Sequence, residues 1–410
     1  MRIKELIFNP KSKYIVITFF TSAIGFLKSF LVLKNFNLDE LGILTLCQTL
    51  ITTISLMQIG VITGGYRLYS YKNPSVLKGV NSSVLIFFIT LSTLLLFLGL
   101  MANILFDIRI SFSYLFSFII IGIISLYSNW AICQLLATKN VHIVNKAQLW
   151  ANITSFGITV SSLWLGFEFV IVGLLIQPMI LIGMSYFYVP ELIPHFNFRI
   201  FKKYTYKIIS VGFVPYLTSA MSLLNSQLGR WIITFSLGTI ILGRIYLVTL
   251  FVTLVSIFPN AISSLFFPSI IEKYEKKMVT DLKGTLKKYF YVLNIYFALI
   301  IIFTLSLINV VVSTFLQNHV ESINLVYATL PSLLFLSLSN PAIILFNAGK
   351  KFNYILTGSI IMVLSYCVLV IIYLIFFQAQ LLGFFIIESI SSFIFFIYNI
   401  YYFIKLNKSN

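Results

Sequence analysis

The sequence contains little charge and few acidic residues. Only 10% of its 410 residues are charged, and the 28 lysines and arginines are opposed by just 11 aspartates and glutamates. Soluble domains carry about 25% charged residues. Here 59% of the residues are hydrophobic, and the mean hydropathy is +1.00. This composition excludes an ordinary soluble domain and indicates a chain whose main solvent is lipid.

Catalytic and cofactor motifs are also lacking. The sequence contains no GxxxxGK[ST] phosphate loop, no GxSxG and no HExxH. The three cysteines lie in separate apolar runs without a CxxC pair, and the three histidines fall in different predicted loops. No outer loop is long enough to hold a catalytic domain. We therefore expect no enzymatic activity, no cofactor, no metal site and no disulfide.

Long apolar runs fill most of the chain. A membrane-spanning helix needs about 20 mostly apolar residues, and continuous runs favour helices over barrel strands, in which apolar and polar residues alternate. The basic N-terminal segment leads directly into the first run, so we expect an uncleaved first helix. The sequence predicts twelve spans, near 14–33, 41–65, 80–103, 112–136, 147–167, 169–188, 207–229, 243–268, 289–312, 324–346, 354–377 and 382–404.

Basic residues alternate between the predicted loops. Most lysines and arginines fall in every second loop, together with both ends of the chain, and few fall in the loops between. Cytoplasmic loops carry this excess of positive charge, so both termini are expected in the cytoplasm, which requires an even number of spans. The basic residues lie between apolar runs, a pattern that favours an anionic membrane surface over nucleic acid as the partner.

The predicted loops divide the chain into two halves. The longest hydrophilic stretch between spans lies near 189–206 and leaves six spans on either side. We therefore expect an N-terminal six-helix bundle over 1–190, a cytoplasmic linker over 191–206 and a C-terminal six-helix bundle over 207–410. Two such halves are typical of transporters built from repeats.

Four charges fall at or near membrane depth, where charged side chains are costly and usually functional. Lys28 lies about two-thirds of the way through the first span. Arg230 ends the seventh span, and Arg244 opens the eighth. These three cations are candidates for binding an anionic substrate, although each is also placed to extend toward the membrane interface. Glu388 in the twelfth span is the candidate for ion coupling, with a helix–helix hydrogen bond as the simpler alternative.

Three segments carry a family resemblance. They are LKSFLVLKNFNLDELGILTL (27–46), LMQIGVITGGYRLYS (56–70) and GRWIITFSLGTIILGRIY (229–246). The first has an acidic turn followed by Leu-Gly, the second is a glycine-containing second span, and the third has a basic residue before Leu-Gly. These features resemble the Wzx-type O-antigen and polysaccharide flippases. This family is part of the multidrug/oligosaccharidyl-lipid/polysaccharide (MOP) transporter superfamily. One position departs from the pattern, because the family often has aspartate where Gly229 precedes Arg230.

The resemblance implies a fold and a function. The fold would be an all-α integral membrane protein of MATE-like architecture, with twelve helices in two bundles. The substrate would be an oligosaccharide linked to a polyprenyl diphosphate of the undecaprenyl type, an O-antigen or related repeat unit. It would move by alternating access through a cationic cleft between the bundles. The resemblance also implies a cell inner membrane location among membrane lipids, and a polysaccharide polymerase and a chain-length regulator as partners.

Other functions stay open at this stage. An ion-coupled multidrug or small-molecule exporter of the same superfamily would favour membrane carboxylates, of which this chain has one candidate. Lipid II flippases usually carry two further helices. A membrane-bound polysaccharide polymerase or acyltransferase would favour a membrane histidine or a large outer loop. A scaffold that transports nothing is the least specific alternative.

Overall fold

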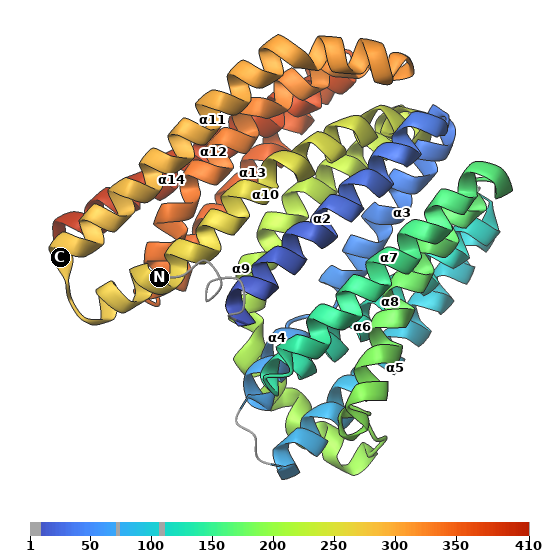
Figure 1. Cartoon of the computed structure of the whole chain (residues 1–410), viewed down its shortest axis with the longest axis vertical. Helices are drawn as coiled ribbons and strands as arrows, with labels where there is room; N and C mark the ends of the chain where they lie inside the picture. Colours follow the sequence, from blue (N-terminus) through green and yellow to red (C-terminus); the bar gives the residue numbers. More distant parts are fainter. Residues whose placement is uncertain (1–9, 71–73, 106–110, 410) are drawn as a thin grey trace. The chain divides into compact units, whose positions relative to one another are not determined.

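The computed structural model describes residues 10–70, 74–105 and 111–409, and helices account for most of them. The chain forms two compact units (Figure 1). Unit 1 comprises Met1–Asn35 and Leu46–Leu217, and unit 2 comprises Phe36–Thr45 and Thr218–Asn410. The chain therefore passes between the units three times, and two helices contribute residues to both. The expected division at a linker over 191–206 stays a prediction.

The helices follow the predicted spans. Each of the twelve predicted segments coincides with one helix or one pair of successive helices. The bounds are α2 Pro10–Asn35, α3 Leu38–Leu56, α4 Val61–Tyr69, α5 Pro74–Leu105, α6 Phe112–Ala137, α7 Val141–Leu165, α8 Glu168–Tyr188, α9 Phe198–Leu237, α10 Thr239–Glu275, α11 Val279–Phe315, α12 Ile323–Ala348, α13 Phe352–Phe376 and α14 Leu381–Ser409. Short 3-10 turns, η1 (Pro190–Leu192) and η2 (Gln317–Ser322), precede α9 and α12.

Two of the spans are bent. Among the described residues, eight helices are long and apolar enough to cross a membrane unaided, and two bent pairs bring the number to ten. The pair α3–α4 turns by 56° at residues 57–60, and α9 turns by 67° between Thr218 and Leu223. The two remaining predicted spans are α2 and α7, of 26 and 25 residues. Both are long enough to cross a bilayer at 1.5 Å per residue, and α7 has polar residues within it, among them Asn145 and Asn152.

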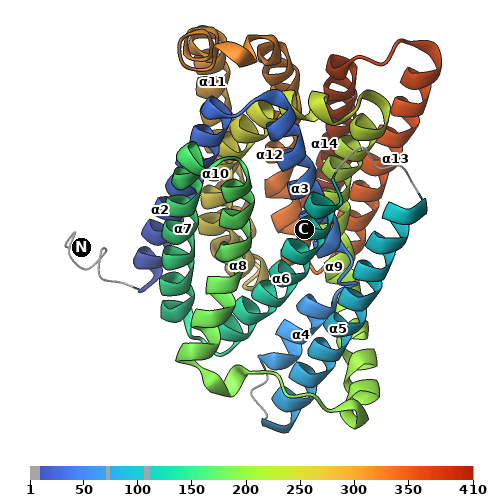
Figure 2. The ribbon, with the colours of Figure 1, turned by 90° about the vertical axis from the view of Figure 1, so that its right-hand side faces the viewer.

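Unit 1 packs around a buried aromatic core. Trp130 of α6 is almost completely buried and meets Tyr69 of α4 edge to face, with ring centroids 5.7 Å apart. Beside it the Gln134 amide donates to Asn81 Oδ1 at 2.5 Å and to the Leu192 carbonyl at 3.0 Å. Figure 2 shows α6, α7 and α8 of this unit side by side. The buried amides therefore join neighbouring helices and satisfy one another.

Unit 2 packs around α12. This helix contacts α10, α11 and α14, and it is the most enclosed of the unit's spans, whereas α11 is mostly exposed. Figure 1 shows α11, α12 and α14 running together. The exposed surface of α11 is largely apolar, including Leu299, Ile302 and Leu305. Such a surface is expected of a helix that faces lipid.

Glycines allow close helix contacts in each unit. In unit 2, a Cβ on Gly42 would overlap the Thr239 carbonyl, and one on Gly243 would overlap the Leu38 carbonyl. In unit 1, Gly64 of α4 meets the backbone of α9 at Gly212 in the same way. Gly42 and Gly243 belong to the segments that carry the family resemblance. Glycine is therefore required at these two positions for steric reasons, since any side chain would separate the two backbones.

Candidate functional site

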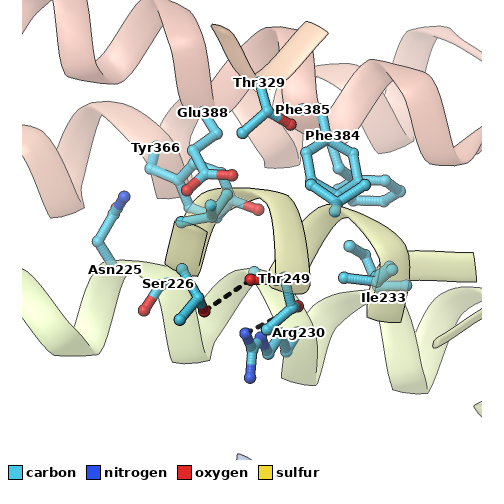
Figure 3. Close-up of a pocket in the computed structure, with 15 residues that line it drawn as sticks. Asn225, Ser226, Arg230, Ile233, Thr249, Thr329, Tyr366, Phe384, Phe385 and Glu388 are labelled. Carbon is cyan, nitrogen blue, oxygen red and sulfur yellow. Dashed lines mark hydrogen bonds between the residues drawn. The ribbon is translucent and has the colours of Figure 1, made fainter. Parts of the chain in front are cut away.

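A polar pocket lies among the helices of unit 2. It has a volume of about 170 Å³ and is formed by α9, α10, α12, α13 and α14 (Figure 3). The buried rings of Phe384 and Phe385 line its apolar side. Its polar lining consists of Asn225, Ser226, Arg230, Thr249, Thr253, Thr329, Tyr366 and Glu388. The pocket thus combines a cation, a carboxylate, an amide and several hydroxyls at membrane depth.

Arg230 and Glu388 both line this pocket. Arg230 is half-buried, and its Nη2 donates to Thr249 Oγ1 at 3.2 Å. Glu388 is half-buried and lines the pocket from α14. Within the described part of the chain, neither residue forms a direct ion pair. The Arg230 guanidinium therefore keeps donors that a ligand can use, because it carries five and the structure engages one.

Tyr366 of α13 explains the unusual glycine before Arg230. A Cβ built on Gly229 would lie 2.8 Å from the Tyr366 hydroxyl, which is closer than side chains pack. Tyr366 is 2% exposed, so the ring cannot move aside easily. An aspartate at this position would collide with it. A carboxylate nevertheless lines the same pocket, because Glu388 reaches it from α14.

Asn225 adds an unsatisfied acceptor to the pocket lining. Its side chain is 5% exposed, and its Oδ1 has no hydrogen-bond partner among the described protein atoms. A buried polar atom without a partner costs about 1–3 kcal/mol. A ligand that donates hydrogen bonds, such as a hydroxyl group, would recover part of that cost. Asn225 is therefore a candidate ligand contact five residues before Arg230 on α9.

Lys28 occupies a different kind of environment in unit 1. Its Nζ donates to Ser155 Oγ of α7 at 2.6 Å, and Ser155 in turn donates to the Gly173 carbonyl of α8 at 2.6 Å. Ser155 is 1% exposed. No carboxylate pairs with Lys28 among the described residues. The cation is thus held by a neutral chain of hydrogen bonds that crosses three helices.

Arg244 lies apart from the pocket. Its Nη2 forms an ion pair with Glu321 of η2 at 2.8 Å, and the two side chains are 43% and 73% exposed. Arg244 therefore has a partner that Arg230 lacks, at a site open to solvent. The structure brings Arg230 and Glu388 together but does not bring Arg244 to them. A role for Arg244 in substrate binding stays a prediction.

Sequence reasoning missed Tyr366 and the threonines of the pocket. A signal for Tyr366 does exist, because it lies in the middle of α13 rather than at a helix end. Tyrosines of the interfacial belt lie near helix ends. Thr249 and Thr329 bear no such mark, since threonine is common in membrane helices and bonds readily to its own backbone.

The described residues include no group of three His, Cys, Asp or Glu side chains that could hold a metal ion. The three cysteines are free thiols in separate helices.

Comparison with known proteins identifies the fold. No family model matches the sequence, and no curated protein matches it. Several solved structures match it closely in shape. An inward-facing multidrug resistance MATE family transporter of the MOP superfamily aligns with a TM-score of 0.79 at 11% identity, covering 95% of both chains. The lipid II flippase MurJ in an inward closed conformation aligns with a TM-score of 0.75 at 17% identity, covering 95% of this chain and 87% of MurJ.

These matches confirm the predicted fold class. The chain is an all-helical membrane protein with the fold shared by MATE transporters and MurJ. An outward-facing MATE structure aligns less well, with a TM-score of 0.66 over 98% of this chain. At these identities the likeness concerns the fold alone. The placement of the termini in the cytoplasm and the assignment to the Wzx-type family stay predictions.

Proposed function

We propose that this protein is a flippase for a polyprenyl-diphosphate-linked oligosaccharide of the cytoplasmic membrane, an O-antigen or related repeat unit. The observation that carries the proposal is the Arg230 guanidinium, which has free donors and no direct ion pair in a hydroxyl-lined pocket of the described structure. A cation kept at membrane depth without a direct ion pair is costly. An anionic substrate that repeatedly enters the membrane interior gives a reason to retain it.

The pocket suits both parts of such a substrate. Arginine binds phosphate oxygens with paired donors. The amide, hydroxyls and aromatic rings around Arg230 provide what a sugar needs, namely hydrogen-bond partners for hydroxyl groups and apolar surface for a ring face. Lys28 in unit 1 adds a second membrane-embedded cation. The fold is shared with a lipid flippase, which supports the proposal without defining the sugar.

Glu388 is the residue that we assign to ion coupling. Its carboxylate lies in the same pocket as Arg230, so its charge state acts directly on the donors proposed to bind phosphate. A charged Glu388 competes with substrate for Arg230, whereas a neutral one leaves Arg230 to the substrate. Transport by alternating access needs affinity that changes during the cycle, and this pair provides such a change.

The experiment that tests the proposal measures which leaflet holds the lipid-linked oligosaccharide. Cells with and without the gene are compared, using a probe that modifies the sugar only from outside. We expect the intermediate to accumulate on the cytoplasmic face when the gene is missing, and an Arg230→Ala protein present at normal membrane levels to behave like the deletion. An unchanged distribution in the deletion would refute the flippase assignment.

A multidrug exporter is the second candidate, because the fold of this chain is equally compatible with that function. Glu388 favours it, since one carboxylate in an aromatic-lined pocket can hold a cationic drug. The two candidates differ in what Arg230 does, because a cation beside the binding carboxylate opposes a cationic drug. Drug resistance that rises on Arg230→Gln would favour export, and loss of surface glycan in the same variant would favour the flippase.

A further inference from the structure

A second cavity lies at one end of unit 2. It has a volume of about 450 Å³ and lies where α10 ends, α11 begins and α12 ends. Figure 1 shows the turn between α10 and α11 at the same end of unit 2 as the end of α14. The alternation of basic loops predicts that this end faces the cytoplasm. None of the residues considered so far for the flippase lines this cavity.

The cavity is rich in cations. Lys273, Lys277 and Lys350 line it, with Glu275 as the one carboxylate among the lining residues. Lys273 Nζ is fixed by a hydrogen bond of 2.6 Å to Thr285 Oγ1. Because three lysines face one glutamate, the lining carries a net positive charge. That balance suits an occupant with about two negative charges.

Two of these lysines have a strained backbone. Lys277 and Lys350 have φ angles of 55° and 54°, in the left-handed region that glycine usually occupies. Each closes the end of a helix, with Lys277 N donating to the Tyr274 carbonyl at 3.1 Å and Lys350 N to the Asn347 carbonyl at 3.1 Å. A non-glycine residue in this conformation costs about 1–2 kcal/mol. At both positions the chain keeps an ammonium group beside the cavity despite that cost.

The cavity also has an uncharged donor. Tyr274 lines it, and its hydroxyl would lie 2.9 Å from a Cβ added to Gly349. Gly349 therefore leaves room for the phenol next to Lys350. A hydroxyl donor and several lysines around one cavity form an arrangement that suits phosphate oxygens. Helix-end lysines are favourable in themselves, as Lys139 at the end of α6 with φ 65° illustrates, but Lys277 and Lys350 differ in lining a common cavity.

We infer that this cavity is a binding site for the diphosphate group of a polyprenyl lipid at the cytoplasmic leaflet. The inference rests on the proposed function for its choice of lipid, and it adds a second site, separate from Arg230, at which the headgroup is held before it enters the membrane interior. The positive charge of the cavity would attract any phosphate group. Selectivity for a diphosphate comes from several hydrogen-bond donors around one cavity.

The test measures binding of farnesyl diphosphate, a short polyprenyl diphosphate, to the full-length protein in nanodiscs of neutral lipid. The measurements use an Arg230→Gln background, so that the pocket of unit 2 does not contribute. We expect the double variant Lys277→Gln/Lys350→Gln to bind at least about tenfold more weakly, as loss of charge-assisted hydrogen bonds predicts. Glutamine keeps the left-handed backbone cost unchanged, so the comparison isolates the charge.

The matched control is Lys287→Gln/Lys288→Gln, which removes the same charge from α11 at residues that do not line the cavity and lie five and six positions beyond Leu282, the last residue of α11 that lines it. Its affinity is expected to change by less than about twofold in about 0.15 M salt, where distant charges are screened. Equal weakening in the two double variants, or no weakening in either, would overturn the site.

A second variant separates binding from folding. Lys277→Gly/Lys350→Gly removes the same two charges but relieves the left-handed strain, so its melting temperature should rise while binding falls. A rise in melting temperature with unchanged binding would contradict the inference.

Competition identifies the source of the phosphate. Farnesyl diphosphate should be displaced poorly by phosphatidylglycerol and by inorganic phosphate at equal concentration, and equal displacement by either would overturn the diphosphate assignment. The two proposals can fail separately. If the protein binds farnesyl diphosphate at this cavity but the leaflet distribution of the lipid-linked oligosaccharide does not depend on the protein, the flippase proposal is refuted. If that distribution does depend on the protein but farnesyl diphosphate does not bind at this cavity, only the second site is refuted.

Discussion

Lys28 in unit 1 and Arg230 in unit 2 occupy corresponding positions in different surroundings. Each lies seven residues before the end of its helix, which is Asn35 for α2 and Leu237 for α9. Lys28 is tied to a buried serine and through it to a helix backbone. Arg230 lies in a pocket with a carboxylate, an amide and several hydroxyls.

The difference shows how two similar halves can divide a task. The Lys28 ammonium is positioned by neutral groups, which hold it without competing for its charge. Arg230 shares its pocket with Glu388, so we expect its readiness to bind an anion to depend on the charge of that carboxyl group. We therefore expect Lys28 to supply a constant positive charge and Arg230 a variable one.

The largest expected effect follows removal of the variable charge. Arg230→Gln should reduce surface glycan by about tenfold to a hundredfold, because hydrogen bonds to charged groups contribute about 1.5–3 kcal/mol. Arg230→Lys keeps the charge but loses the paired donors, so its glycan yield should lie between those of Arg230→Gln and the parent. Glycan yield normalised to membrane protein level is the measurement. Equal yields from Arg230→Gln and the parent would remove Arg230 from the mechanism.

The next effect concerns the carboxylate that Glu388 provides. Gly229→Asp should lower glycan yield by about tenfold, because the added Cβ meets the Tyr366 hydroxyl and overpacking costs about 1–3 kcal/mol. Adding Tyr366→Phe removes the clashing oxygen. In that double variant, Glu388→Gln should be tolerated better than in the parent, since the introduced aspartate then supplies the acid. The same loss in both backgrounds would show that Glu388 is needed at its own position.

A smaller effect is expected in unit 1. Ser155→Ala removes the anchor of Lys28 and should lower glycan yield severalfold, and Lys28→Met should lower it further. A double-mutant cycle measured by thermal stability should give a coupling of about 1–3 kcal/mol, the range for residues in one hydrogen-bond network. Additive effects would mean that Ser155 does not position Lys28. Ser161→Ala on the same helix is the matched control, because its hydroxyl bonds only to its own helix at the Ile158 carbonyl.

The smallest effect is predicted for Arg244. Its ion pair with Glu321 is solvent-exposed, and exposed pairs contribute about 0–1 kcal/mol. Arg244→Gln should therefore leave the glycan yield within about twofold of that of the parent. Glu321→Gln should have an equally small effect. A loss as large as that of Arg230→Gln would place Arg244 in the substrate path.

The fold was predictable because a membrane helix must satisfy its own backbone, so each span leaves a continuous apolar run. The breaks were harder to locate. The first, at α3–α4, lies at Gly60, which has a φ of 80°. The bend in α9 follows Pro215 by several residues, and its position depends on packing that the sequence does not display. The individual charges Lys28 and Arg230 were identifiable since charge stands out in an apolar run.

The site was only partly predictable, because its members come together by tertiary packing. Arg230 and Glu388 are separated by α10 to α13 in the chain, and nothing local to either indicates the other. The glycine in place of the family's aspartate was visible in the sequence. The reason for the glycine was not visible in the sequence, because the close contact that favours it comes from the hydroxyl of Tyr366 on another helix.

The exchange of segments between the two units has a consequence for biosynthesis. Phe36–Thr45 is made early but belongs to unit 2, and its contact with Thr239 waits for about 200 further residues. At about 5–20 residues per second this delay is about 10–40 s. Unit 1 likewise stays incomplete until the ribosome has passed Leu217. The nascent chain must therefore hold two unfinished bundles in the bilayer at once, a period in which insertion factors have their greatest opportunity to act.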